Sequence, residues 1–282
     1  MDTKQVQLGN GTTLAYLERP GGDIPLVLLH GITNNAASYE PVLAGIDAGC
    51  HVYALDFRGH GNSSRPSARY DTAAYADDVI HFISEVVCKP VLLGGHSLGG
   101  LVTVQTAVTA PERIRAIFLE DPPLYFVGSM DPIYEALFNG VVVMATTLQD
   151  GSRSAEEWFQ VMAKAPDPYN GKPGLEVMGE ARIRRRLDSI GRMDPRAMQD
   201  GLDGALKWDT DAVLARIKCP VTMITGNRAL GAVISEEETR RVQSIVNDCK
   251  VTNVPDVGHM INDLRPAEWQ AAINGWIRGQ VG

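Results

Sequence analysis

The sequence predicts an α/β fold, in which helices cover both faces of a mostly parallel sheet. Three observations predict it. Short apolar runs recur along the chain, helical stretches separate most of them, and one segment of about one hundred residues interrupts the alternation. Strands buried on both faces of a parallel sheet have such continuous apolar runs. Their alternation with helices is typical of a doubly wound sheet.

The predicted elements follow an N-terminal hairpin. Residues 1–20 alternate apolar and polar positions around the turn signal Gly-Asn-Gly, which indicates an antiparallel pair of strands. The predicted buried strands are 25–30, 50–56, 90–96, 114–121, 220–225 and 250–254. The predicted helices are 72–87, 98–110, 235–247 and 264–278. The last of these has an apolar face made of Trp269, Ile273, Trp276 and Ile277.

The interruption in this alternation predicts the domain organisation. Residues 125–206 have helical patterning and no convincing strand, so we expect a helical cap inserted into a core formed by 1–124 and 207–282. In doubly wound sheets ligands bind at the carboxyl ends of the strands. An insertion at that edge is a candidate lid.

Composition and charge exclude several classes of function. The net charge of −8 disfavours nucleic acid and anionic membranes as partners, because phosphates would be repelled. No apolar run is long enough to span a bilayer, and the N-terminus lacks the apolar region of a signal peptide. The four cysteines are scattered singly, which favours a reduced, cytoplasmic protein with a small-molecule substrate. The sequence does not predict an oligomeric state.

The strongest local motif is Gly95-His96-Ser97-Leu98-Gly99, a G-x-S-x-G between a predicted strand and a predicted helix. A serine on such a sharp turn has its hydroxyl exposed at the sheet edge, and the flanking glycines avoid clashes. The amide of Leu98 at the helix N-terminus can stabilise a developing oxyanion. This context favours a nucleophilic Ser97 over a glycine-rich turn used only for packing.

Two further segments fit a serine nucleophile. The loop after the first buried strand, Leu29-His30-Gly31-Ile32, offers the Ile32 amide as a second oxyanion donor, although a plain turn is an equal alternative. His259 follows the last predicted strand and thus lies at the same sheet edge as Ser97. A general base follows the nucleophile in this chain order, so we expect His259 to have that role.

Together, GHSLGG at 95–100, LLHG at 28–31, LDFRGHGNSS at 55–64 and VGHM at 257–260 resemble the α/β-hydrolase superfamily. The resemblance covers the core, 1–124 and 207–282. It implies an eight-stranded, mostly parallel sheet, a Ser–acid–His triad and an oxyanion hole of two backbone amides. It does not identify a substrate, because the superfamily includes esterases, lactonases, amidases and C–C hydrolases.

The acid of the triad is missing from its commonest position. That position follows the seventh strand, and in the segment Gly226-Asn227-Arg228-Ala229 it is occupied by Ala229. We expect Asp121 instead, at the end of the strand beside the nucleophile strand. Some branches of the superfamily that this chain resembles, including zearalenone-type lactonases and the hydrolases of vitamin B6 breakdown, place their acid at the corresponding site. The alternatives are Glu120, whose side chain should point to the other face of the sheet, a purely capping Asp121, and no working acid.

These residues predict a serine hydrolase of a carboxylic ester or lactone, with no cofactor and no metal. Ser97 attacks, His259 transfers the proton, Asp121 orients His259, and the Ile32 and Leu98 amides hold the oxyanion. An amidase or C–C hydrolase with the same triad, a cofactor-free oxygenase and a non-catalytic ligand receptor remain alternatives. The run Arg182, Arg184, Arg185 and Arg186 could hold an anionic substrate, but a solvated helix face is the preferred interpretation.

Overall fold

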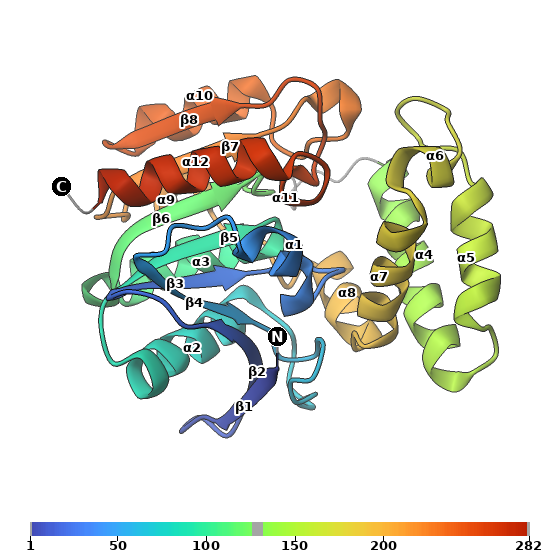
Figure 1. Cartoon of the computed structure of the whole chain (residues 1–282), viewed down its shortest axis with the longest axis horizontal. Coiled ribbons are helices and arrows are strands. Elements are labelled where there is room, and N and C mark those ends of the chain that lie inside the picture. Colours follow the sequence, from blue (N-terminus) through green and yellow to red (C-terminus); the bar gives the residue numbers. More distant parts are fainter. Residues whose placement is uncertain (1, 126–131, 281–282) are drawn as a thin grey trace.

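The computed structural model describes residues 2–125 and 132–280. Within them, an eight-stranded sheet has the order β1-β2-β4-β3-β5-β6-β7-β8 (Figure 1). β1 pairs antiparallel with β2 and β2 with β4, whereas all the other pairs are parallel. The predicted fold class is confirmed. The strands are β1 (Thr3–Gln7), β2 (Thr13–Arg19), β3 (Ile24–Leu29), β4 (Cys50–Leu55), β5 (Val91–His96), β6 (Ile114–Glu120), β7 (Val221–Thr225) and β8 (Cys249–Asn253).

Helices cover both faces of this sheet, and the continuous apolar runs explain why. In β3, Val27 and Leu29 pack with α2 and α3 on one face, whereas Leu26 and Leu28 pack with α1 and α12 on the other. All four side chains are buried, because successive residues of a strand point to opposite faces. The elements that flank the sheet are η1 (Ala36–Tyr39), α1 (Glu40–Leu43), α2 (Thr72–Phe82), η2 (Ile83–Val87), α3 (Leu98–Thr109), η3 (Pro111–Arg113), α9 (Thr210–Leu214), η5 (Arg228–Leu230), α10 (Glu236–Ile245), α11 (Ile261–Leu264) and α12 (Pro266–Gly279).

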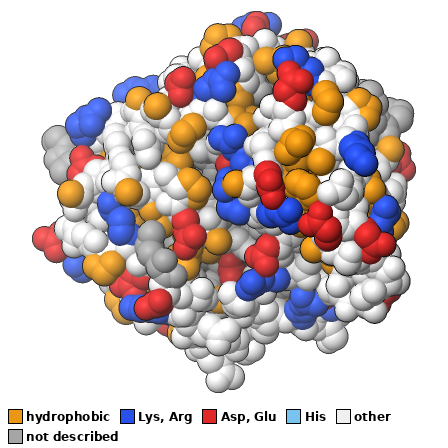
Figure 2. Space-filling view, turned by 45° about the vertical axis from the view of Figure 1, so that its right-hand side comes forward, with side chains coloured by type: hydrophobic (Ala, Val, Ile, Leu, Met, Phe, Trp, Pro, Cys, Tyr) orange, Lys and Arg blue, Asp and Glu red, His pale blue; other side chains and the backbone are white. Residues whose placement is uncertain are grey.

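A separate group of helices lies beyond one edge of the sheet, between β6 and β7 in the chain (Figure 1). It consists of α4 (Pro132–Asp150), α5 (Ala155–Lys164), α6 (Gly174–Met178), α7 (Glu180–Gly191) and α8 (Pro195–Leu202). We call these the cap helices. Buried side chains such as Trp158, Ile183 and Leu187 pack among them. Figure 2 brings this side forward and shows basic and acidic side chains interspersed over it. No helix in the described ranges is long and apolar enough to cross a membrane.

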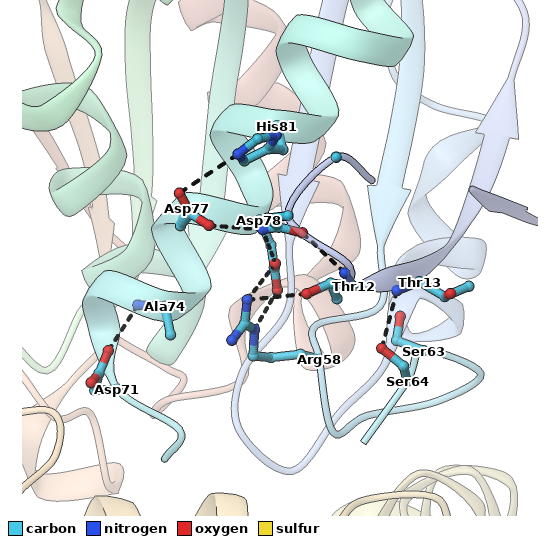
Figure 3. A network of polar contacts seen from close by, with 12 residues as sticks. Thr12, Thr13, Arg58, Ser63, Ser64, Asp71, Ala74, Asp77, Asp78 and His81 are labelled. Carbon is cyan, nitrogen blue, oxygen red and sulfur yellow. Dashed lines mark hydrogen bonds and ion pairs between the residues drawn. The ribbon is translucent and has the colours of Figure 1, made fainter. Parts of the chain in front are cut away.

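A buried polar network ties the N-terminal hairpin and the loop after β4 to α2 (Figure 3). The Arg58 guanidinium donates two hydrogen bonds of 2.5 Å to the Asp78 carboxylate and one of 3.2 Å to Thr12 Oγ1. Asn10 Nδ2 donates to Asp78 Oδ1 at 2.9 Å. Because a bidentate arginine–carboxylate pair fixes both position and orientation, the loop after β4 is held rigidly beneath the carboxyl edge of the sheet.

Candidate active site

Ser97 lies between β5 and α3 in a strained backbone conformation, with φ +53° and ψ −118°. Two glycines make this turn possible. A Cβ atom on Gly95 would lie 2.1 Å from the Gly99 carbonyl oxygen, and one on Gly99 would lie 2.1 Å from the Leu29 carbonyl oxygen. Strained residues of this kind persist only where the surrounding structure fixes them, and they cluster at functional sites. The geometry is that of a nucleophile elbow.

His259 and Asp121 are joined by a short hydrogen bond, 2.6 Å from Nδ1 to Oδ2. Asp121 is fully buried and follows β6 directly, with φ +40°. The Val233 amide donates to the same Oδ2 at 2.8 Å, and the Ile234 amide lies 3.5 Å from Oδ1. Two backbone donors therefore fix the carboxylate that orients the imidazole.

His259 is also held next to the nucleophile. His96 Nε2 donates to the His259 carbonyl at 3.0 Å, and the two imidazole rings lie 4.6 Å apart. In the part of the chain that the structure describes, no hydrogen bond joins Ser97 Oγ to the His259 ring. Such contacts are often long in the absence of substrate and tighten in the reacting complex. The structure thus brings the three predicted residues to one sheet edge.

The rival carboxylates lie elsewhere. Glu120 points to the opposite face, where it accepts hydrogen bonds of 2.7 Å from the Asn262 amide and from Trp269 Nε1. Burial raises the pKa of the Glu120 carboxyl to about 8, and its contacts anchor α11 and α12. Ala229 is exposed in η5, and the three glutamates at 236–238 form the first turn of α10. Of these carboxyl groups, Asp121 alone contacts the imidazole.

The two predicted oxyanion amides lie on either side of the nucleophile. Leu98 is the first residue of α3, where an amide has no acceptor within its own helix. Ile32 follows Gly31, which packs directly against the elbow. The Ile32 carbonyl is occupied by His60 Nε2 at 2.8 Å, whereas no hydrogen bond of the described residues uses the Ile32 amide. This arrangement leaves both N–H groups available for an oxyanion.

We predict that Gly31→Ala lowers kcat for an activated ester by about 10²-fold, the effect of losing one oxyanion donor. The added Cβ would lie 2.8 Å from His96 Nδ1 and 3.2 Å from Ser97 Cβ, so the loop that presents Ile32 must move. Gly275→Ala on α12 is the matched control, since its Cβ meets nothing within 4 Å. Melting temperatures of both variants separate misfolding from loss of the donor. An unchanged kcat in Gly31→Ala would remove Ile32 from the oxyanion hole.

A cavity of about 740 Å³ opens beside this edge and reaches His259. Its walls come from the loop after β3, the segment 167–170, α7, and the loops after β7 and β8. A volume of this size fits a small molecule rather than a polymer. Within residues 2–125 and 132–280, no group of three or more histidine, cysteine or acidic side chains is arranged as a metal site.

Comparison with known proteins identifies the family. The sequence model described as "Alpha/beta hydrolase family" matches residues 26–273 of the 282 in the chain. The chain belongs to this family. The α/β hydrolase is similar to the (E)-2-((N-methylformamido)methylene)succinate hydrolase of Acinetobacter baylyi, with 25% identity over 98% of both chains. It is also similar to the 2-(acetamidomethylene)succinate hydrolase of Mesorhizobium japonicum, with 24% identity over 98% of this chain and 95% of the relative.

A solved structure supports the same fold for this α/β hydrolase. The N-formylmaleamic acid deformylase of Pseudomonas putida S16 superimposes with a TM-score of 0.78 at 20% identity, over 96% of this chain and all of that one. At this identity the likeness establishes the shared fold and no more.

Sequence reasoning missed the groups that support Asp121 in this α/β hydrolase. The Val233 and Ile234 amides act through their backbone, so no side-chain pattern signals them. They belong to the segment that follows Ala229, the position at which the acid is missing. The loop after β7 therefore contacts the candidate acid, as a donor to its carboxylate rather than as its source.

Proposed function

We propose that this α/β hydrolase cleaves a carboxylic ester or a lactone through an acyl-enzyme on Ser97. The observation that carries the proposal is the 2.6 Å contact between Asp121 and His259, next to a serine on a strained elbow. A histidine whose Nδ1–H is bound by a carboxylate presents its unprotonated Nε2 as a base.

In this mechanism, Ser97 Oγ attacks the substrate carbonyl carbon while His259 accepts the hydroxyl proton. The Ile32 and Leu98 amides donate to the oxyanion of the tetrahedral intermediate. His259 then protonates the leaving oxygen, which departs as an alcohol, or stays attached as a hydroxyl group if the substrate is a lactone. Water, deprotonated by His259, attacks the acyl-enzyme and regenerates Ser97. Asp121 stabilises the imidazolium at both stages and remains ionised.

A second candidate is hydrolysis of an amide with the same residues. The names of the two curated relatives include formamido and acetamido groups, and both describe substituted succinates. The attack of Ser97 and the tetrahedral intermediate are the same for an ester and for an amide. The two reactions differ when the leaving group departs, because His259 must then protonate the amide nitrogen. The groups around the bond therefore decide between the two candidates.

A panel of 4-nitrophenyl esters, lactones and 4-nitroanilides tests the proposal. We expect ester or lactone turnover that survives exhaustive chelation and strict anaerobiosis, since every step uses protein groups and water. Faster turnover of the anilides than of matched esters would favour the amidase. A strict need for oxygen would replace the proposal with an oxygenase, and binding of the compounds without any turnover would indicate a receptor.

A further inference from the structure

We propose that Arg186 on α7 binds a carboxylate group of the substrate, so that the hydrolase acts on esters, lactones or amides that carry a second, free carboxylate. This inference rests on the proposed function, because it takes the cavity beside His259 as the substrate site. The candidate residue comes from the arginine run of the cap, whose four members have different environments.

Three of the four arginines form ion pairs with nearby acids. Arg182 Nε and Arg185 Nη2 lie 3.2 and 3.0 Å from Asp263 Oδ1. Arg184 pairs with Glu180 at 2.7 Å and with Glu156 at 3.1 Å. Arg184 and Arg185 are exposed, as the solvated helix face predicted. These side chains are surface ion pairs and need no ligand.

Arg186 differs from its neighbours. Its side chain is partly buried and lines the cavity, and within the described residues it makes no hydrogen bond and no ion pair. A guanidinium remains charged in proteins, and one that lines a cavity without a protein partner is available to pair with an anion. Burial lowers the pKa of Arg186, opposed by the charge of Asp263. An anion bound in the cavity would supply the missing partner.

Arg186 shares its cavity with the candidate base. His259 lines the same cavity, so an anion bound to Arg186 would lie in the space that His259 reaches. Burial holds the pKa of His96, the residue before Ser97, well below its ordinary value, and the Arg186 guanidinium adds a smaller effect in the same direction.

Two further polar side chains of the cavity wall can assist. Ser189 is three residues after Arg186 and thus on the same face of α7. Asn34 follows the oxyanion loop. Both residues are buried, both line the cavity, and neither side chain has a hydrogen bond in the described ranges. They offer donors to an oxygen that Arg186 leaves unsatisfied.

The wall favours a carboxylate over a phosphate. A single guanidinium matches the two oxygens of a carboxylate in a bidentate pair. The cavity wall also has four acidic residues, which are Asp167, Asp188, Asp256 and Asp263. Their negative charges would repel a dianion more strongly than a singly charged carboxylate.

The test compares mono-(4-nitrophenyl) glutarate with its methyl ester, which has nearly the same shape and no charge. We expect the wild-type hydrolase to prefer the free acid. Arg186→Gln should lower kcat/KM for the free acid about 10- to 100-fold, the range for a charge-assisted hydrogen bond, and change the methyl ester less than about threefold. Arg186→Lys keeps the charge without the planar fork and should fall between. Arg240→Gln, at an exposed residue of α10 that pairs with Glu236 away from the cavity, is the matched control and should match wild type.

A binding measurement separates this inference from the proposed function. In Ser97→Ala, calorimetry should detect glutarate binding that weakens about tenfold or more when Arg186→Gln is added. If no ester is turned over but this loss appears, the proposed function fails and Arg186 remains the anion site. Equal losses for acid and methyl ester, or glutarate binding that ignores Arg186→Gln, would overturn the inference.

Discussion

Ser97→Ala is expected to abolish ester turnover, with kcat reduced about 10⁶-fold, the loss found when a serine triad loses its nucleophile. The alanine removes the attacking oxygen from the elbow, where Ser97 precedes the Leu98 amide. A fluorophosphonate should label Ser97 and no other serine. The label is located by mass spectrometry, and the rate is measured with a 4-nitrophenyl ester.

The matched control is Ser244→Ala, which removes an exposed hydroxyl on α10. It should retain wild-type kcat and full labelling. An unmodified Ser97 after treatment, together with intact turnover in Ser97→Ala, would end the serine-hydrolase proposal.

The second large effect concerns the relocated acid. Asp121→Asn should lower kcat about 10⁴-fold, because an asparagine of the same shape can hold the imidazole in the wrong tautomer. The asparagine side chain lacks the negative charge that stabilises the imidazolium. The fold should survive, since the side-chain oxygen of the asparagine can still accept from the Val233 amide. The measurement is kcat for the same ester, with the melting temperature alongside.

Glu120→Gln tests the neighbouring carboxyl. Glu120 contacts Asn262 and Trp269 rather than His259, so its replacement should affect stability while leaving kcat within about tenfold, far short of the loss expected for a triad member. Near-full activity in Asp121→Asn would show that the enzyme works as a dyad or takes its acid elsewhere.

Much of the fold could be predicted because strands that are buried on both faces of a sheet have continuous apolar runs in the sequence. The apolar run that contains Leu26 to Leu29 predicts a central strand, and the structure places alternate members of that run in two different cores. The helix expected at 264–278 is observed as α12, and a break at Arg265 separates it from the short α11 that precedes it. Pro266 explains the break, because a proline begins a helix readily and is disfavoured within one.

The site was predictable where side chains carry the chemistry. The commonest position of the acid is occupied by Ala229, so the acid was expected on the adjacent strand. Because side chains alternate between the faces of a strand, Asp121 rather than Glu120 was expected to face His259. The sequence alone could not distinguish Arg186 from Arg182, Arg184 and Arg185, because which of the four faces the cavity depends on how α7 packs among the cap helices. No sequence pattern indicates the backbone N–H groups that donate to Asp121.

The contact between Val233 and Asp121 also bears on how such a site can change over evolutionary time. A backbone N–H group donates a hydrogen bond regardless of the side chain of its residue. The sequence of the segment after β7 can therefore diverge while its hydrogen bonds to the Asp121 carboxylate are preserved. The substitution that it cannot accept at 233 is proline, which has no N–H to donate. Selection at this position thus acts on the course of the main chain, and a comparison of side chains alone would overlook it.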